Sequence, residues 1–291
     1  MFRSLIFVPG NSTRFVEKAK TLRADVICFD LEDSVPTNEK DVARKIIADA
    51  ISQRQEYQRS LYVRTNSPDS GMVSADLKAV IHKGIDGIVV PKVNDSKEMT
   101  MIKKQIIELE KKRRIGKVAL MPSIETAKGI VNAYHIANSD ERINALVFGV
   151  FDFLHDMRMD FDENDSTGYA YARAKIPIDA RAAGVEAIDA IWQKIDDLQG
   201  LVRDAMNAKR LGYGGKSIVH PNQIDTVHKV FLPSKDEIEW SRKVVSALGE
   251  AMEKGTGRGT IRLEGKMIDA VHYKQAKTIL TIVDNSDFHD F

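Results

Sequence analysis

The chain has 291 residues, of which 43% are hydrophobic and 29% charged, enough for a large core and a polar surface. Lys and Arg number 43, Asp and Glu 42, so the net charge of +1 predicts neither a nucleic-acid partner nor a membrane surface. The first ten residues lack the pattern of a signal peptide, and no apolar run approaches a membrane span. The single cysteine, Cys28, lies in an apolar run, where a buried inert thiol is expected. It excludes a disulfide framework within one chain and indicates a reducing, cytoplasmic location.

Short runs rich in Val, Ile and Phe alternate with amphipathic helical segments. Eight runs are predicted strands: residues 4–8, 25–30, 61–65, 87–91, 118–122, 145–149, 185–189 and 216–220. Continuous apolar runs are typical of parallel strands buried on both faces. Segments such as 38–52 and 96–112 have helical periodicity. The eightfold repeat predicts an α/β fold, a (β/α)8 TIM barrel, with an open doubly wound sheet as the alternative.

The pattern changes after the eighth run. From Pro233 on, the sequence predicts a helix over 234–254, a Gly-rich turn, a short extended piece and a second helix from about Gly265. We therefore expect a barrel domain over residues 1–232 and a C-terminal helical extension over 233–291. The extension either packs on its own chain or contacts an adjacent subunit. The acidic, turn-rich segment 157–168 is a predicted loop.

Two carboxylates come at the ends of predicted strands. Glu125 closes the run VALMPSIE, and Asp152 closes ALVFGVFD. A barrel builds its active site from the carboxyl ends of its strands. Because no Cys or His stands nearby at zinc spacing, two hard oxygen ligands predict a Mg²⁺ site, or a Mn²⁺ site, with positions open for substrate and water. The alternative is that both acids cap helices.

An arginine and three acids follow the second and third predicted strands. Arg64 ends LYVRT, and a buried strand arginine is costly unless it is paired. We expect its side chain to face an anion at the barrel mouth. Asp30, Glu32 and Asp33 in FDLEDSVP are candidates for orienting metal-bound waters or holding the arginine. A purely structural ion pair with one of these acids is the alternative.

Two further segments are candidate anion sites. Arg14 and Lys18 fall on one face of a predicted helix start, which can hold a phosphate or carboxylate, although a solvated face is the ordinary reading. The Gly-rich segment GYGGKSIVHPNQI contains Gly215, Lys216 and His220 near predicted strand eight, where barrels often bind phosphate. It lacks the Walker spacing. His220 precedes a proline and is expected to be structural rather than a base.

One acid in the tail also attracts interest. Asp269 lies within the otherwise apolar turn KMIDAV. Taken alone, it is expected to be a helix N-cap.

Taken together, these segments resemble the β-subunit of citrate lyase and the related malyl-CoA and citramalyl-CoA lyases of the HpcH/HpaI aldolase/citrate lyase superfamily. The matching segments, in chain order, are RSLIFVPGNSTRFVEKA, ICFDLEDSVP, YVRTN, VVPKV, PSIETAKGIVNA, FGVFDF, ARAAGVEAIDAI, GYGGKSIVHPNQI and LEGKMID. They run from residue 3 to 270, so the resemblance covers nearly the whole chain.

The resemblance implies that Glu125 and Asp152 hold Mg²⁺ and that Arg64 contacts substrate. It also implies that Asp269 is the catalytic acid/base in the site of an adjacent subunit, so that a homo-oligomer, a trimer or hexamer, is the catalytic unit. Coenzyme A would lie near Arg14, Lys18 and the loop that contains Gly215, Lys216 and His220.

One position departs from the family pattern, because Phe151 stands in GVFDF where the family usually has an acid. The neighbouring ligand position, Asp152, is kept.

The site residues and the resemblance predict cleavage of a 3-hydroxyacyl thioester, such as citryl-CoA or its acyl-carrier-protein counterpart, to acetyl-CoA and a 2-oxo acid such as oxaloacetate. Malyl-CoA or citramalyl-CoA cleavage is the alternative. Two rival functions fit the same residues: a metal-dependent aldolase for free acids, and a non-catalytic scaffold subunit of a larger lyase complex. The pattern demands no Schiff-base lysine, and Lys92 in VVPKV is the one to check.

Overall fold

The computed structural model describes residues 2–162, 167–253 and 260–284, with side chains described outside 250–253. The chain divides into two compact units, Met1–His228 and Lys229–Phe291. We refer to them as the barrel unit and the C-terminal unit. The predicted boundary at 232/233 falls a few residues later than the division observed.

The barrel unit is built around a closed sheet of eight parallel strands in chain order, β1-β2-β3-β4-β5-β6-β7-β8, with β8 also paired to β1. The predicted (β/α)8 barrel is therefore confirmed, and the open sheet is excluded. The strands are β1 (Ser4–Pro9), β2 (Val26–Asp30), β3 (Ser60–Arg64), β4 (Gly87–Val90), β5 (Ala119–Ile124), β6 (Ala145–Phe148), β7 (Glu186–Asp189) and β8 (Gly215–Ile218). Each overlaps the run that predicted it.

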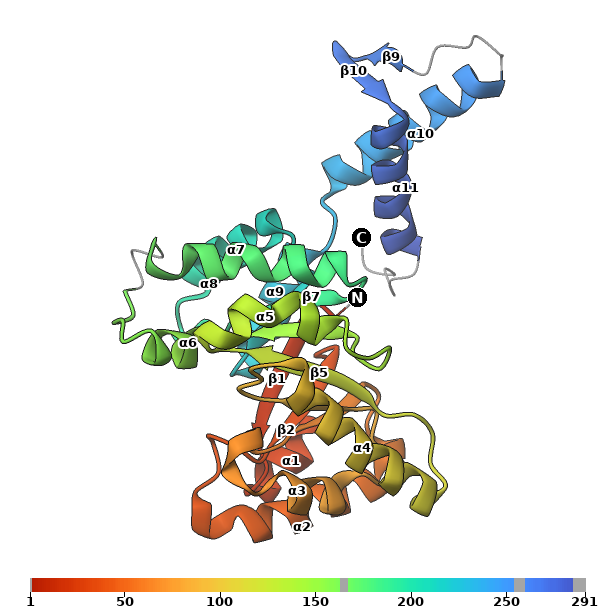
Figure 1. The fold of residues 1–291 in the computed structure, drawn as a ribbon. Coiled ribbons are helices and arrows are strands. Elements are labelled where there is room, and N and C mark those ends of the chain that lie inside the picture. Colours follow the sequence, from red (N-terminus) through yellow and green to blue (C-terminus); the bar gives the residue numbers. More distant parts are fainter. Residues whose placement is uncertain (1, 163–166, 254–259, 285–291) are drawn as a thin grey trace. The chain divides into compact units, whose positions relative to one another are not determined.

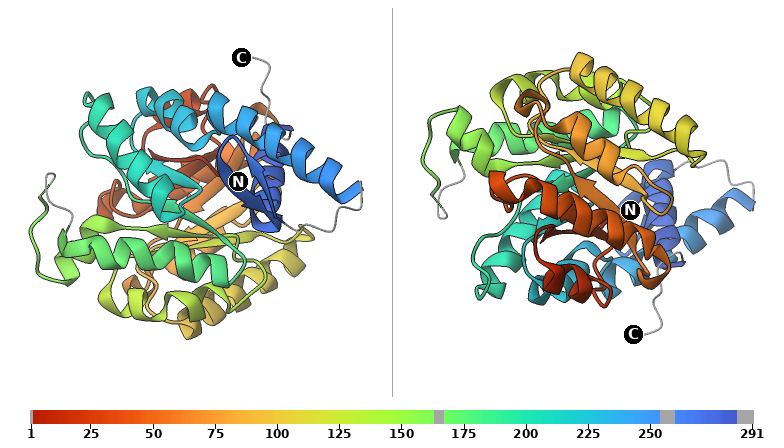
Figure 2. Two further views of the ribbon diagram at one scale, coloured as in Figure 1. Left: turned by 90° about the horizontal axis from the view of Figure 1, so that it is seen from above. Right: turned by 90° about the horizontal axis from the view of Figure 1, so that it is seen from below.

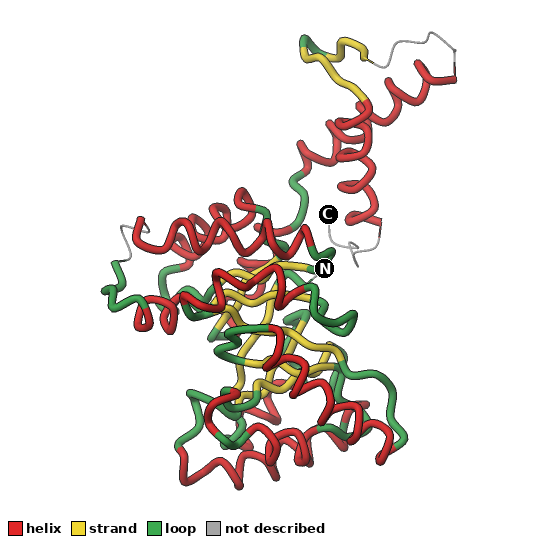
Figure 3. The backbone as a smooth tube through the Cα atoms, in the orientation of Figure 1, coloured by secondary structure: helices red, strands yellow, loops and turns green. Residues whose placement is uncertain are grey.

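Helices surround the strands, as the views from above and below in Figure 2 show. They are α1 (Thr13–Ala19), α2 (Lys40–Ser52), α3 (Val73–Val80), α4 (Ser96–Arg113), α5 (Ala127–Ala137), α6 (Val150–Asp156), α7 (Thr167–Ala182), α8 (Leu198–Leu211) and α9 (Ile224–Phe231). Short 3₁₀ helices lie at η1 (Thr37–Glu39), η2 (Arg54–Glu56), η3 (Pro68–Ser70) and η4 (Pro221–Gln223). Figure 3 shows the strands inside and the helices outside. The strands are apolar on both faces because one face lines the barrel and the other packs under helices.

The barrel interior is filled by side chains rather than left open. One buried cluster takes residues from seven neighbouring strands: Leu5, Val26, Cys28, Tyr62, Val89, Met121, Ala145, Val147 and Ile188. These residues are the inward-facing positions of their strands, since alternate residues point to opposite faces. The buried thiol expected at Cys28 is confirmed.

The C-terminal unit contains α10 (Lys235–Glu253), a hairpin of β9 (Thr260–Leu263) and β10 (Lys266–Asp269), and α11 (Ala270–Asp284). The predicted extended piece and second helix are both observed, but the helix begins at Ala270 rather than at about Gly265, because residues 266–269 pair with 260–263. Glu264 and Gly265 both have positive φ, 47° and 81°, which matches the two-residue turns that suit the twist of a hairpin. Val244, Leu248, Ile268 and Ala276 form a separate small core. Within the described residues, no helix is long and apolar enough to cross a membrane.

Candidate active site at the carboxyl ends of the strands

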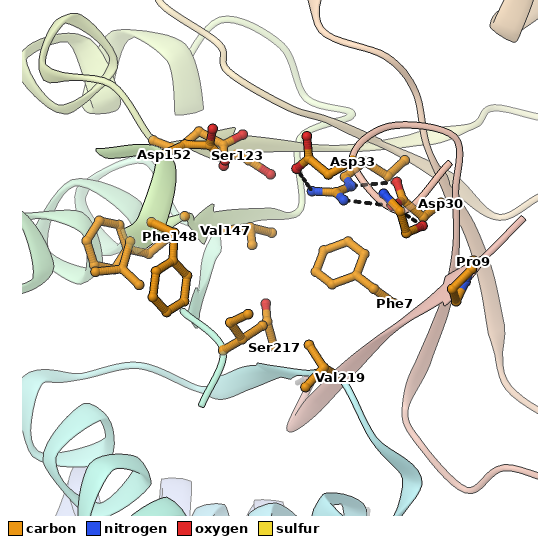
Figure 4. A pocket seen from close by; sticks show the side chains of 17 residues that line it. Phe7, Pro9, Asp30, Asp33, Ser123, Val147, Phe148, Asp152, Ser217 and Val219 are labelled. Carbon is orange, nitrogen blue, oxygen red and sulfur yellow. Dashed lines mark hydrogen bonds and ion pairs between the residues drawn. The ribbon is translucent and has the colours of Figure 1, made fainter. Parts of the chain in front are cut away.

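A cavity of about 430 Å³ lies at the carboxyl ends of the barrel strands. Its charged lining consists of one cation and four acids: Arg64, Asp30, Asp33, Glu125 and Asp152. Figure 4 shows Asp30, Asp33 and Asp152 along one side, and Phe7, Phe148 and Val219 along the other. The interior residue Val147 also lines the cavity, which therefore lies on top of the packed core.

Arg64 is held in place by acids at the end of β2 and just after it. Asp30 and Arg64 are register partners on β2 and β3, and Nε and Nη2 donate to the two carboxylate oxygens at 2.7 and 2.8 Å. Glu32 lies 3.1 Å from Nη1, and the guanidinium stacks 4.7 Å from the ring centre of Phe7. Burial acts to raise the pKa of Asp30, but Arg64 and the Ser34 hydroxyl lower it to about 2. The ion pair considered as an alternative exists, and the guanidinium still faces the cavity.

Lys92 lies at the centre of the acids. It follows β4 with a φ of 53°, and its backbone N–H donates to Oε1 of Glu125 at 2.6 Å. Its Nζ lies 2.9 Å from Glu32, 3.2 Å from Asp152 and 3.5 Å from Asp33. Burial acts to lower the pKa of Lys92, but these carboxylates, Glu32 foremost, raise it above its ordinary value. A charged, ion-paired amine is not a nucleophile, so the structure gives no support for a Schiff base here.

Glu125 and Asp152 are brought together from different elements. Glu125 follows β5 and is 4% exposed, whereas Asp152 belongs to the first turn of α6 rather than to a strand. Burial, with the nearby charge of Asp152, raises the pKa of Glu125 to about 7. A Cβ at Gly149 would lie only 2.0 Å from Oε2 of Glu125, so glycine at this position makes room for the carboxylate.

These residues fit a hard divalent cation. The acids at this end of the barrel outnumber Arg64 and Lys92, and their donors are the carboxylate oxygens that Mg²⁺ prefers. No group of three or more His, Cys, Asp or Glu among the described residues is arranged as a complete metal cage. The assignment of Glu125 and Asp152 as ligands of a Mg²⁺ ion, with water or substrate at its other positions, stays a prediction.

Three of the predicted anion-binding residues are exposed at the surface of the barrel unit. Arg14 and Lys18 project from α1, whose N-cap is Ser12. His220 follows β8, and its side chain accepts a hydrogen bond from the Asn222 N–H at the start of η4. The structural role expected for His220 is therefore observed, and contact with a ligand stays a prediction.

The contacts of Gly215 and Lys216 give no support to the prediction that they bind coenzyme A, which stays a prediction. Both begin β8, at the end of the strand opposite the cavity. A Cβ at Gly215 would lie 1.8 Å from the Phe2 carbonyl oxygen, so this glycine allows close approach of protein backbone rather than ligand. Lys216 has no exposed surface. Its amine donates to Asp189, Asp204 and the Ala190 carbonyl oxygen.

Asp269 ends β10 in the C-terminal unit. Its Oδ1 accepts hydrogen bonds from the N–H groups of Val271 and His272, which is the N-cap geometry expected from the sequence. The His272 ring, with Nδ1 2.7 Å from Oδ1, is the main cause that lowers the pKa of Asp269. The carboxylate remains 38% exposed and accessible. Its action in a neighbouring subunit stays a prediction.

Sequence reasoning missed several lining residues. Ser123, Ser217 and Phe7 face the cavity from β5, β8 and β1. Alternation along the strands places Val147 and Leu5 inward and could have predicted that Ser217 also points inward. That prediction requires the register between β8 and β1, which the sequence does not give. Phe151, where the family usually has an acid, also lines the cavity, and its ring lies 5.0 Å from that of Phe161.

Comparison with known proteins agrees with this geometry. Residues 3–221 match the family model described as HpcH/HpaI aldolase/citrate lyase. Citrate lyase subunit beta from Leuconostoc mesenteroides subsp. cremoris is 35% identical over 290 residues, covering 99% of this chain and 95% of the relative. The mitochondrial citramalyl-CoA lyase of Rattus norvegicus is 31% identical, covering 96% of this chain and 85% of the relative.

A solved structure of the protein CitE from Mycobacterium tuberculosis, in complex with magnesium, acetoacetate and coenzyme A, superposes with a TM-score of 0.78. It is 26% identical and covers 98% of both chains. The match of the family model, together with relatives above 30% identity over nearly the whole chain, places this protein as a member of the HpcH/HpaI aldolase/citrate lyase family.

Proposed function

We propose that the protein is a Mg²⁺-dependent carbon–carbon lyase that cleaves a 3-hydroxyacyl thioester to an acetyl thioester and a 2-oxo acid. The observation that carries the proposal is the meeting of Glu125, Asp152 and Arg64 in one cavity at the carboxyl ends of the strands. Membership of the lyase family and a relative solved with magnesium and coenzyme A support it.

The residues have separate tasks in this proposal. Glu125 and Asp152 would hold the metal, which when bound supplies a Lewis acid for the oxygens of the departing 2-oxo acid. Arg64, fixed by Asp30, presents a permanent positive charge to the negative charge that develops on the thioester oxygen. Cleavage breaks the bond between C2 and C3, the 3-hydroxyl loses its proton, and C2 of the acetyl unit gains one. Asp269 of an adjacent subunit is the proposed acid/base for these transfers.

The proposal also names the thioester that is cleaved. Relatives are named citrate lyase subunit beta and citramalyl-CoA lyase, so citryl-CoA is the first candidate, with citramalyl-CoA and malyl-CoA as alternatives. The carrier is coenzyme A or an acyl carrier protein. The competing proposal is a subunit that is active only within a larger lyase complex. Mg²⁺-dependent release of a 2-oxo acid by the isolated chain separates the two.

The decisive experiment assays a panel of thioesters, citryl-CoA, citramalyl-CoA and malyl-CoA, with the wild type and with Glu125→Gln. We expect the variant to remain folded, since glutamine can still accept the Lys92 N–H, and to lose at least ~100-fold in kcat. Addition of Mg²⁺ should raise the Tm of the wild type but not of the variant.

The matched control for this substitution is Glu110→Gln, which alters a buried glutamate paired to Arg142 away from the cavity. This variant should lose stability and keep its response to Mg²⁺. Full activity of Glu125→Gln in the presence of a chelator would refute the metal site.

A further inference from the structure

Ser217 stands out as a buried polar group without a partner. It lies in β8, is 1% exposed and lines the cavity. Its Oγ makes no hydrogen bond to any of the described residues. Buried hydroxyls in folded proteins are almost always hydrogen-bonded, because the bonds to water lost on burial must be replaced. An unpartnered hydroxyl on a cavity wall therefore indicates a place for a ligand atom.

The strand register fixes the direction of this side chain. Ser217 pairs with Leu5 across β8 and β1, and Leu5 belongs to the cluster that fills the barrel. Register partners of parallel strands point to the same face of the sheet, so Ser217 also points inward. Figure 4 shows it on the cavity side that carries Phe7 and Val219.

The two sides of the cavity differ in polarity. In the closed strand order, β8 lies between β7 and β1, across the barrel from β3 and β5, which carry Arg64 and lead into Glu125. Besides Ser217, the cavity residues that come from β8, from its neighbours β1 and β7, and from the segments directly after them are all apolar: Phe7, Pro9, Ile191 and Val219. Ser217 thus provides a single neutral hydroxyl on an otherwise apolar wall.

The apolar surroundings of Ser217 determine whether its hydroxyl binds a charged or a neutral ligand oxygen. A carboxylate placed against the apolar wall would lose its hydration, and one neutral hydroxyl does not replace it. A neutral oxygen needs only one or two hydrogen bonds and is matched by Ser217. The charged side, with Arg64 and the proposed metal ligands, is where a substrate carboxylate belongs.

We infer that Ser217 is a substrate-binding residue whose hydroxyl hydrogen-bonds an uncharged oxygen of the bound thioester. This inference rests on the proposed function, because in a 3-hydroxyacyl thioester the uncharged oxygens are the thioester carbonyl and the 3-hydroxyl. The hydrogen bond orients the acyl chain on the apolar wall while the opposite wall holds its charged end.

The test is a comparison of stability with activity in Ser217→Ala. Because the hydroxyl is unsatisfied in the free protein, its removal should leave the Tm unchanged or raise it. The same change should lower kcat/KM for the preferred thioester about 10-fold, because it removes one hydrogen bond to substrate. A lower Tm, or an unchanged kcat/KM, overturns the inference.

Thr65→Val is the matched control. The Thr65 hydroxyl is also fully buried and unpartnered among the described residues, but it does not line the cavity. Its replacement should likewise leave the Tm unchanged or raise it, and kcat/KM should stay the same. A loss of activity equal to that of Ser217→Ala would mean that the effect comes from core packing.

Binding to acetyl-CoA and 3-hydroxybutyryl-CoA, measured by calorimetry, identifies the oxygen. If Ser217→Ala weakens both, the partner is the thioester carbonyl; if it weakens only 3-hydroxybutyryl-CoA, the partner is the 3-hydroxyl. Should the wild type cleave no thioester of the panel, the proposed function fails and the same binding comparison still tests Ser217. Equal affinities of the wild type and the variant for 3-hydroxybutyryl-CoA, or no binding to the wild type, overturn the inference.

Discussion

Arg64 combines a structural contact with a surface available to substrate. Its fork-shaped guanidinium makes two parallel bonds to Asp30, and its remaining edge faces Glu32, Asp33 and the cavity. A planar group with several donors can serve both sides at once, which a lysine amine cannot do.

We therefore predict that Arg64→Lys is not a conservative change. The amine cannot keep both bonds to Asp30 and also reach a substrate oxygen, so kcat/KM should fall at least about 10-fold, ~1.4 kcal/mol in the barrier. Steady-state kinetics well below the Tm of the variant measure this. An unchanged kcat/KM with a lowered Tm would assign Arg64 to structure alone.

Lys216 gives a second prediction at this scale. Its amine neutralises Asp189 and Asp204 inside the barrel unit, where Arg173 is the other cation. Lys216→Met leaves buried carboxylates without one of their cations, which should cost about 3 kcal/mol of unfolding free energy in urea titrations. KM for the thioester should not change.

Lys18→Met is the control with the opposite expectation. Lys18 is exposed on α1, so its loss should leave stability unchanged and raise KM if it binds the phosphates of coenzyme A. A raised KM for Lys216→Met would support Lys216 as a ligand-binding residue.

At the scale of elements, the contact between α9 and β1 contains a titratable group. His228 of α9 lies with Nε2 2.7 Å from the hydroxyl of Ser4, and 3.7 Å from Asp25. Burial is the main cause that lowers the pKa of His228 to about 4, with Arg3 and Arg59 acting in the same direction and Asp25 against it. The folded barrel therefore holds this histidine neutral.

The consequence is a pH-dependent stability. Between pH 6.5 and about 4 the unfolded chain binds a proton at His228 and the folded chain does not, so stability falls as the pH falls through this window. The loss of stability at pH 4 is up to about 3 kcal/mol.

In His228→Gln, which can still hydrogen-bond Ser4, this part of the pH dependence should disappear from urea titrations at pH 7 and pH 4.5. His135→Gln, an exposed histidine of α5, should keep it. Identical pH slopes for the wild type and His228→Gln would contradict the assignment.

At the scale of the whole molecule, the candidate chemistry is divided between two units. Glu125 and Arg64 belong to the barrel unit, whereas Asp269 belongs to the C-terminal unit. We propose that a trimer or hexamer brings Asp269 of one subunit to the cavity of another. Truncation after Pro233 should then leave a folded barrel with little or no activity, which circular dichroism and the thioester assay check together.

Mixing two inactive variants tests shared sites directly. In mixed oligomers of Glu125→Gln and Asp269→Asn, some sites combine a wild-type Glu125 with a wild-type Asp269 from its neighbour. If sites are shared, activity partly returns after subunit exchange. Absence of recovery, with exchange confirmed by native mass spectrometry, would mean that Asp269 serves its own chain or only caps α11.

The sequence by itself determined the architecture of the barrel. Residues of parallel strands are buried on both faces, so each of the eight strands is an apolar run in the sequence. Each can therefore be predicted without knowing which strands lie beside it. The order of strands also follows from the repeat, because short βα units place consecutive strands side by side. Glu125 and Arg64 were found for the same reason, since carboxyl ends of barrel strands converge.

What the tertiary structure alone decided concerns direction and partners. Lys216 and Ser217 are adjacent in β8, yet the amine of Lys216 is buried against Asp189 of β7 and Asp204 of α8, whereas Ser217 faces the cavity. Lys92 has a left-handed backbone conformation directly after β4, and its side chain lies among the acids. Residues 266–269 became a strand because residues 260–263 pair with them. The partners of Lys92 and Lys216 come from segments distant in the chain, and the hairpin requires two short strands to pair with each other. The periodicity of a single segment records neither kind of partner.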